Sequence, residues 1–316
     1  MLLRIAERTA VLLVSLAVSS VLVFGFMVLL PGDPARVALG VNATEADVLR
    51  LRLEFGLQRP RVEQYLSWIG GLVRLDPGVS YISRAPIGPQ IADRLQVSLI
   101  LVVASMLIAV AIALPFGTLM AVHHRKASGL ILSAFSQVGV AVPAFLAGIL
   151  LITVFAVQLR WLPASGWTPP AYDPGMFLQQ LLLPALSLGL VQGAVLTRYV
   201  RSSVLEVLRE DFLRTARAKG LTPLQALVRH GLRNAAVPVV TVLGLQLATL
   251  LVGAVVIERV FVIPGLGSLL LDAVGNRDLI VVQDVVMVLV VAVLIVNFVV
   301  DLLYLAIDPR LRTVAR

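Results

Sequence analysis

The sequence predicts an all-α polytopic membrane protein with six transmembrane helices, a small helical segment outside the membrane and a cytoplasmic loop of short helices. Three observations carry this prediction. Apolar residues make up 59% of the 316-residue chain and charged residues 14%, with a mean hydropathy of +0.96, whereas an ordinary soluble domain is nearer half apolar and a quarter charged. Six stretches are long and apolar enough to cross a bilayer, and positive charge gathers at alternate ends of them.

The six spans follow from the thickness of the bilayer core, about 30 Å, which a helix of roughly 20 apolar residues crosses. We expect spans at 9–30, 95–122, 127–159, 174–197, 234–257 and 285–307. The third stretch is longer than one span needs. The first follows Arg4 and Arg8 in the manner of a signal peptide, but Pro31-Gly32-Asp33 stands where a cleavage motif would be. We therefore expect this stretch to remain as a membrane helix.

The chain is expected to divide into an N-terminal helix (1–30), a polar helical segment (31–94) and a five-helix membrane core (95–316) that carries the loop 198–234. If the N-terminus is cytoplasmic, the cytoplasmic pieces hold fifteen Lys and Arg residues against five acids, net +10, and the outer pieces are net −1. Positive residues near span ends mark the cytoplasmic side. Both termini are therefore predicted to be cytoplasmic.

Composition excludes several functional classes. The chain has no cysteine, which removes disulfides, thiolate catalysis and zinc–thiolate sites. Its only histidines are His123, His124 and His230, and the adjacent pair would point about 100° apart on a helix, so we expect no metal site. The net charge of +8 would suggest nucleic acid in a soluble protein. The apolar fraction overrides that interpretation, and we expect no nucleic-acid partner.

The segment 31–94 is too polar to lie in lipid. Thr44 followed by acids predicts the start of a helix that ends before Gly56. After Pro60 the apolar residues recur at i, i+3, i+4 and i+7, which predicts an amphipathic helix. Asp76-Pro77-Gly78 predicts a turn. The segment either packs over the outer helix ends or docks a partner protein, and the two interpretations are compatible.

The loop between spans four and five has the strongest local signals. Acids open its first helix and bases close it, which complements the helix dipole, and Gly220 suits a left-handed helix end. Thr222 and Gln225 form a potential capping box for a second helix, with Pro223 at its first position. One face of that helix is expected to hold Leu224, Leu227, Val228 and Leu232. Such a loop can lie on anionic lipid, but its tight corner favours docking of a partner protein.

These residues resemble the coupling-loop signature of permeases of ATP-binding-cassette (ABC) importers, E-A-A-x3-G followed about ten residues later by I-x-L-P. Thr215-Ala216-Arg217-Ala218-Lys219-Gly220 and His230-Gly231-Leu232-Arg233-Asn234 follow the variant of the dipeptide/oligopeptide/nickel permease family, and of its first permease subunit. Further motifs similar to that family are Leu30-Pro31-Gly32-Asp33-Pro34, Leu162-Pro163-Ala164-Ser165-Gly166-Trp167, Glu258-Arg259-Val260-Phe261 and Asp308-Pro309-Arg310. One departure is Asp76-Pro77-Gly78, where the family has an aromatic residue between the acid and the glycine.

The resemblance implies a subunit of the bacterial inner membrane that forms half of the path for short peptides and works by alternating access. Its implied partners are a second, homologous permease, two ATPases and an extracytoplasmic solute-binding protein, with lipid around the spans. Dipeptides, longer peptides, nickel chelates and haem all remain possible solutes. The residues implied to couple the chain to an ATPase are Arg214, Thr215, Ala216, Lys219, Gly220, Leu221, His230, Arg233 and Asn234.

The energy source is expected to lie on another chain. A phosphate-binding loop needs a lysine between a glycine and a serine or threonine, and neither Lys126 nor Lys219 has that context. We therefore expect no enzyme activity and no cofactor here, with ATP and Mg²⁺ bound by the partner subunits. A secondary transporter would need coupling acids within its spans, and a membrane enzyme would need a metal cluster or a nucleophile with its base. The sequence offers weak support for a secondary transporter and none for a membrane enzyme.

Polar residues within the spans are the candidates for the solute path. In the fifth span these are Thr241, Gln246 and Thr249, which either pack helices closely or line a water-filled cavity. In the sixth span, Asn297 and Asp301 favour a structural or subunit-contact role over proton coupling. The candidates for an outer gate or a binding-protein contact are Trp161, Trp167, Phe261, Pro264, Gly265 and Gly267. Membrane anchoring is the alternative role for the two tryptophans.

Overall fold

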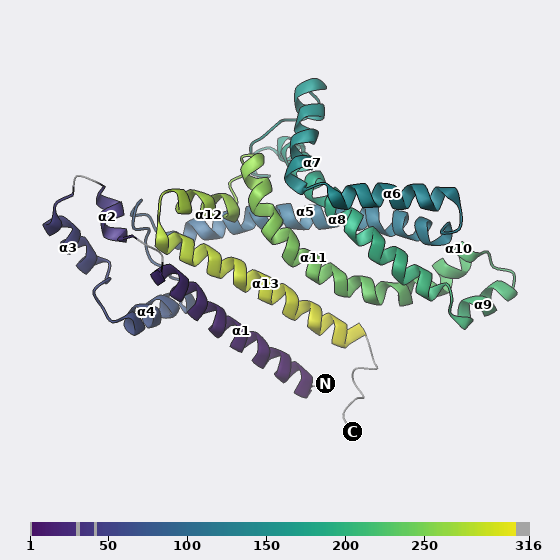
Figure 1. The fold of residues 1–316 in the computed structure, drawn as a ribbon, viewed down its shortest axis with the longest axis horizontal. Coiled ribbons are helices and arrows are strands. Elements are labelled where there is room, and N and C mark those ends of the chain that lie inside the picture. Colours follow the sequence, from purple (N-terminus) through teal and green to yellow (C-terminus); the bar gives the residue numbers. More distant parts are fainter. Residues whose placement is uncertain (1, 30–31, 41–42, 308–316) are drawn as a thin grey trace. The chain divides into compact units, whose positions relative to one another are not determined.

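The computed structural model describes residues 2–29, 32–40 and 43–307 and confirms the all-α fold class (Figure 1). Five of its helices are long and apolar enough to cross a membrane, and a bent helix pair supplies a sixth crossing if it is one span. Within the described ranges, the one β-type pairing is an isolated bridge between Val79 and Pro86. The family motifs at Leu30-Pro31 and Asp308-Pro309-Arg310 lie outside the described residues.

The helices are α1 (Leu2–Leu29), α2 (Pro34–Leu39), α3 (Glu45–Glu54), α4 (Arg61–Val73), α5 (Ile87–Val122), α6 (Ala127–Ala141), α7 (Ala144–Leu151), the π-helix η1 (Ile152–Gln158), α8 (Pro174–Val207), α9 (Asp211–Ala218), α10 (Pro223–Ala226), the π-turn η2 (Leu227–Gly231), α11 (Leu232–Val260), α12 (Leu266–Gly275) and α13 (Leu279–Ile307). Several begin or end well beyond the expected spans. The expected spans stop at charged residues, whereas helices such as α5 and α8 continue past them.

The described residues form two compact units. The first comprises 99–263 with 2–6 and 296–307, and the second comprises 7–98 and 264–295, each without the undescribed positions. In the first unit, α8 packs against α11, α6 and α7. Glycines also allow α5 and α8 to approach closely: a Cβ at Gly117 of α5 would lie 2.6 Å from Cβ of Val200, and one at Gly189 of α8 would lie 2.7 Å from Cγ2 of Ile108.

The stretch 127–159, expected as one long helix, is broken. The segments Ala127–Ala141 and Ala144–Gln158 meet at an angle of 100°. Pro143 causes the break, because it has no N–H for the helix and excludes the helical conformation from the residue before it. Val142 is accordingly extended, at φ −85° and ψ 121°. The expectation of an uninterrupted helix was wrong here, although the pair together is long enough for one crossing.

In the second unit, the expected helix starts and turns of the segment between α1 and α5 are present. The hydroxyl of Thr44 accepts a hydrogen bond from the backbone N–H of Asp47 (3.2 Å), as the cap prediction requires. The α3 helix ends at Glu54, and Gly56 has a positive φ of 67°. The Asp76 carboxylate accepts from the N–H of Gly78 (3.2 Å), which closes the expected turn.

An aromatic cluster joins α4 to α1 within this unit. The ring of Phe24 lies 5.5 Å from that of Tyr65 and 6.1 Å from that of Trp68, measured between centroids. The hydroxyls of Ser20 and Tyr65 are 2.8 Å apart and share a hydrogen bond. The amphipathic α4 therefore has a defined apolar partner, which supports the packing interpretation of the segment.

Candidate functional site

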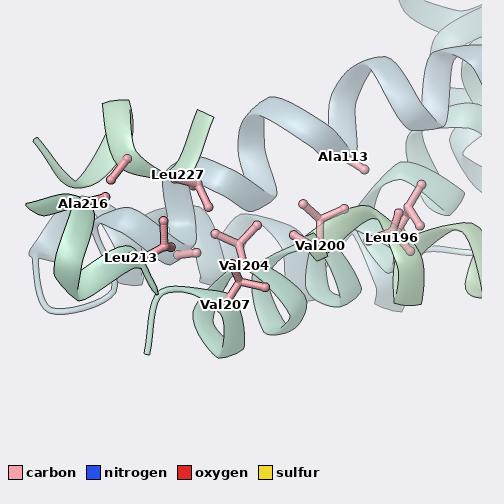
Figure 2. Close-up of a cluster of buried hydrophobic side chains, with 12 residues drawn as sticks. Ala113, Leu196, Val200, Val204, Val207, Leu213, Ala216 and Leu227 are labelled. Carbon is pink, nitrogen blue, oxygen red and sulfur yellow. The ribbon is translucent and has the colours of Figure 1, made fainter. Parts of the chain in front are cut away.

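The loop between α8 and α11 is anchored by a small apolar core (Figure 2). Leu213 and Ala216 of α9 are buried together with Val204 and Val207 of α8, and Leu227 joins them from the other side of the corner. Leu213 is 1% exposed and Leu227 is 0% exposed. This packing makes the loop an extension of the helical core, with little freedom to move independently of α8.

The corner of the loop has the geometry that the sequence predicts. Gly220 adopts φ +93°, the left-handed region, and its N–H donates to the carbonyl of Arg217 (3.0 Å). The capping box is reciprocal: the N–H of Thr222 donates to Oε1 of Gln225 (3.0 Å), and the N–H of Gln225 donates to Oγ1 of Thr222 (3.3 Å). Both predictions are confirmed, because both depend only on residues close in sequence.

The helix after the corner differs from the expectation of a separate amphipathic helix. The single turn α10 continues through η2 directly into α11. Leu227 is fully buried, whereas Leu224, Val228 and Leu232 are 46%, 58% and 38% exposed. The expected single apolar face is therefore wrong: the π-turn adds a residue to one helical turn and rotates the faces that follow.

Gly231 ends this π-turn against the apolar core of the loop. A Cβ at Gly231 would lie 2.8 Å from Cδ1 of Leu227 and 3.1 Å from Cγ1 of Val207. The hydroxyl of Ser203 on α8 also donates to the carbonyl of Ala235 on α11 (2.7 Å). The two long helices are thus joined directly beside the loop.

Most of the predicted coupling residues lie on the outside of this anchored loop. Exposed among them are Arg214, Thr215, Lys219, Gly220, His230, Arg233 and Asn234. Leu221 is half-buried, and Ala216 belongs to the apolar core. Sequence reasoning missed Phe212, which is 40% exposed beside the same cations. An aromatic side chain on the polar face of a short helix was the available signal.

The polar residues proposed for the path are dispersed within the first unit. In α11, Thr241 and Gln246 are half-buried, and the exposed Thr249 donates its hydroxyl to the carbonyl of Leu245 (3.0 Å). In α13, Asn297 and Asp301 are half-buried. A buried polar residue that the sequence reading missed is Gln192 of α8, at 8% exposure. It lies in the middle of an apolar stretch, which is itself a signal of a special role.

Two loops of the first unit that are predicted from the sequence to lie outside the membrane meet at their backbones. The N–H of Gly166 donates to the carbonyl of Phe261 (3.0 Å), and the Phe261 side chain is buried at 1% exposure. Trp167 packs edge-on against Phe177 at 5.3 Å between centroids. Trp161 is 68% exposed. Of these aromatic candidates, Trp161 therefore presents the most surface to a partner or to lipid.

The remaining outer candidates lie at the start of α12 in the second unit. Pro264 is half-buried, and Gly265 and Gly267 are buried. The N–H of Leu266 donates to the hydroxyl of Ser98 (2.8 Å), which fixes this helix start. The motif thus acts in packing on this chain, with limited surface for a partner.

A cavity of about 800 Å³ opens within the second unit, where the end of α1, the ends of α3 and α4 and the start of α13 come together. Arg52 pairs with Asp33 across its wall (N···O 2.6 Å). The hydrogen bond that Arg52 donates to the Asp33 carboxylate, together with the charge of that carboxylate, raises the pKa of Arg52 above its ordinary value. Phe55 stacks on Tyr81 at 4.2 Å between centroids. Burial and the nearby carboxylates of Asp284 and Asp278 raise the pKa of Tyr81 to about 12.

Two buried acids stabilise the wall of this cavity. Asp278 accepts hydrogen bonds from the Ser80 hydroxyl and from the N–H of Tyr81 (3.3 Å to the latter), and Asp284 accepts from the indole of Trp68 (2.7 Å). Sequence reasoning had counted both acids only as outer charges. Within the described residues, no group of three or more His, Cys, Asp or Glu side chains has the arrangement of a metal site.

Comparisons with known proteins bear on the whole chain. Residues 113–313 match the model of a family described as "Binding-protein-dependent transport system inner membrane component", and residues 1–102 match the corresponding N-terminal model. The chain is 40% identical over 311 residues to the glutathione transport system permease protein GsiC of Escherichia coli K12, and equally to that of Shigella dysenteriae serotype 1. Each alignment covers 98% of both chains.

A solved structure of an inward-facing methionine ABC transporter, MetNI, has a chain of similar fold. The TM-score is 0.58 at 20% identity, over 69% of this chain and 96% of the other. At that identity, the similarity is one of fold.

Proposed function

Because the chain belongs to the family of binding-protein-dependent transport system inner membrane components, and is therefore a permease subunit of an ABC importer, we propose that it forms half of a path for short peptides. Partner ATPases drive alternating access of this path. The observation that carries the proposal is the anchored loop around Gly220, which presents a rigid, cationic and partly aromatic surface.

The loop can transmit the movement of a partner ATPase to the long helices α8 and α11. Short helices that fill a groove on a partner are a recurrent docking mode, and the exposed side chains of Phe212, Arg214 and Lys219 supply the contacts. Because Leu213 and Leu227 lock the loop to α8, movement of an ATPase moves α8 and α11 as rigid bodies. A loop that only covered lipid would have no use for this anchoring.

The complete importer holds further chains. ATP and Mg²⁺ are bound by two ATPase subunits, since neither lysine of this chain stands in a phosphate-binding loop. A second, homologous permease forms the other half of the path, and an extracytoplasmic binding protein delivers the solute. Both termini and the loop 198–234 lie in the cytoplasm, on the side where positive residues gather.

The solute is a short peptide. The GsiC relatives are named for glutathione, a tripeptide, which makes it the first solute to test. Sparse polar residues such as Gln246, Thr249 and Gln192 suit a wide and tolerant path. Asp301 has a structural or subunit-contact role near the inner end of α13.

The experiment replaces Gly220 in the reconstituted complex. Valine is strained at φ +93°, whereas asparagine tolerates the left-handed region and is the matched control. We expect Gly220→Val to keep ATP hydrolysis but lose peptide uptake into proteoliposomes, and Gly220→Asn to retain both. Normal uptake by the valine variant would overturn the coupling role.

A further inference from the structure

The cavity of the second unit carries more positive charge than its acids neutralise. Four arginines line it, Arg52, Arg59, Arg61 and Arg74, along with Asp33, Glu54 and Asp76. Arg52 pairs with Asp33 (2.6 Å), and Glu54 pairs with Arg84, which stands outside the lining (2.7 Å). The charges of Asp33 and Glu54 are therefore already compensated by Arg52 and Arg84, and these two acids do not neutralise the other arginines of the lining.

The remaining arginines form no ion pair within the described part of the chain. Arg61 donates only to the amide oxygen of Gln64 (3.3 Å), and neither Arg59 nor Arg74 has an acid within salt-bridge distance. Asp76 is the one other lining acid, and its Oδ1 accepts from the N–H of Gly78. Among the residues that line the cavity, the charges of Arg59, Arg61 and Arg74 are therefore opposed only by that of Asp76, an excess of +2 in the lining before the buried Asp278 and Asp284 behind it are counted.

Several residues around the cavity have defined side-chain contacts, whereas these arginines have no acidic partner within the described part of the chain. Phe55 is sandwiched, with Tyr81 stacked at 4.2 Å and the guanidinium carbon of Arg84 at 4.7 Å from its centroid. Trp68 is buried, and its indole N–H donates a hydrogen bond to Asp284. Exposed arginines without an acidic partner, beside such a wall, can bind an anion, because arginine binds carboxylates through paired, charge-assisted hydrogen bonds.

The volume of the cavity indicates the size of ligand that it can hold. A volume of about 800 Å³ is in the range of sites for whole small molecules, which run from roughly 300 to 1,000 Å³. A single inorganic anion would leave most of it empty. The aromatic and amide groups of the walls suit the backbone and side chains of a short peptide.

We propose that this cavity is a binding site for anionic short peptides, in which Arg59, Arg61 and Arg74 bind the peptide carboxylates. The site lies on the extracytoplasmic side in the orientation proposed above. It selects solutes by charge before they enter the membrane path, so the chain itself contributes to specificity. This inference rests on the proposed peptide transport.

The test uses the full importer complex in lipid nanodiscs without its binding protein. The probes are the dipeptides Ala-Glu, Ala-Ala and Ala-Lys, which carry net charges of about −1, 0 and +1 at pH 7, and their dissociation constants are measured by calorimetry. We expect Ala-Glu to bind about tenfold more tightly than Ala-Lys, since a hydrogen bond between charged groups is worth at least one factor of ten. That preference should weaken as salt is raised.

The variants are Arg74→Gln and Arg59→Gln, with Arg50→Gln as the matched control. Arg50 is an exposed arginine of α3 outside the cavity lining, so its replacement changes the net charge of the segment equally. The cavity variants should lose the charge preference, and the control should keep it. Equal affinities for the three peptides in the wild type, or equal effects of all three variants, would overturn the inference.

Peptide uptake with the binding protein present separates this inference from the proposed function. Retained uptake of Ala-Ala without any charge preference in binding overturns the cavity site alone. Absence of uptake for every peptide overturns the transport proposal. A charge preference that is seen only when the binding protein is present also overturns the peptide site. In that case the arginines are assigned a contact with an acidic surface of the binding protein.

Discussion

The indole Nε1 of Trp68 donates a 2.7 Å hydrogen bond to Oδ1 of Asp284, a residue 216 positions further along the chain. Both side chains are buried, Trp68 at 8% exposure and Asp284 at 0%. The other carboxylate oxygen, Oδ2, has no hydrogen-bond partner among the described residues. Within the described part of the chain, this bond is therefore the one side-chain hydrogen bond that the buried Asp284 carboxylate receives.

Trp68→Phe should destabilise the protein by about 1–3 kcal/mol, the cost of leaving a buried polar group unsatisfied. Asp284→Leu in the Trp68→Phe background should recover part of that loss, because both partners are then apolar. Thermal unfolding of the purified chain in detergent measures each term of the cycle. Trp161→Phe, at a largely exposed tryptophan, is the control and should change stability by no more than about 0.5 kcal/mol.

Tyr81 should ionise late, with a midpoint near pH 12. Its pKa in the folded protein is raised above the ordinary tyrosine value of 10.0, chiefly by burial, so the folded state holds this proton more tightly than the unfolded chain. The resulting stability is complete below pH 10 and is lost as the pH rises from 10 to about 12. Phenolate absorbance of wild type minus Tyr81→Phe gives the midpoint directly. A midpoint near 10 would contradict the burial described here.

Gly231→Ala should destabilise the loop by about 1–3 kcal/mol, because the added methyl overpacks a filled core. The nearest atom, Cδ1 of Leu227 at 2.8 Å, belongs to a side chain with no free space around it. Gly25→Ala in α1 is the matched control, since nothing lies within 4 Å of its Cβ position. It should be neutral or slightly stabilising. Equal unfolding temperatures for the two variants would contradict the tight packing at Gly231.

Gly244 and Val300 should behave as a coupled pair. A Cβ at Gly244 would come within 2.6 Å of Cγ1 of Val300, so Gly244→Ala forces α11 and α13 apart. Val300→Ala makes room, and the double variant should be more stable than the sum of the two single effects predicts. Thermal unfolding of the four proteins gives the interaction energy. Strict additivity would show that the helices do not approach as closely as described.

Local features of this chain were readable from the sequence because they involve neighbouring residues. The capping box of Thr222 and Gln225 and the left-handed Gly220 are determined within a few positions. The long helices followed from hydropathy, since the cost of placing a charge in lipid dominates every other preference there.

Features that depend on distant residues were not readable. Nothing near Trp68 in the sequence points to Asp284, and the +2 excess in the cavity emerges only once Arg52 and Glu54 are known to be paired. The break at Pro143 is an intermediate case. Pro143 was a visible signal of a helix break in the sequence. The stretches on both sides of it are uniformly apolar, however, so that the hydropathy predicted a single span.

That break determines the topology of everything after it. At about 1.5 Å per residue, the 15 residues of α6 span roughly 22 Å, too short for the bilayer core of about 30 Å. With the N-terminus in the cytoplasm, as proposed above, a bent pair that re-entered and left on the same side would place the arginine-rich loop around Gly220 outside the cell, away from the proposed ATPases. The positive charge of both the N-terminus and the loop favours α6 and α7 crossing together. In a chain without native cysteine, thiol labelling of a single Cys introduced at position 219, and in a separate variant near the N-terminus, shows whether the two positions lie on the same side.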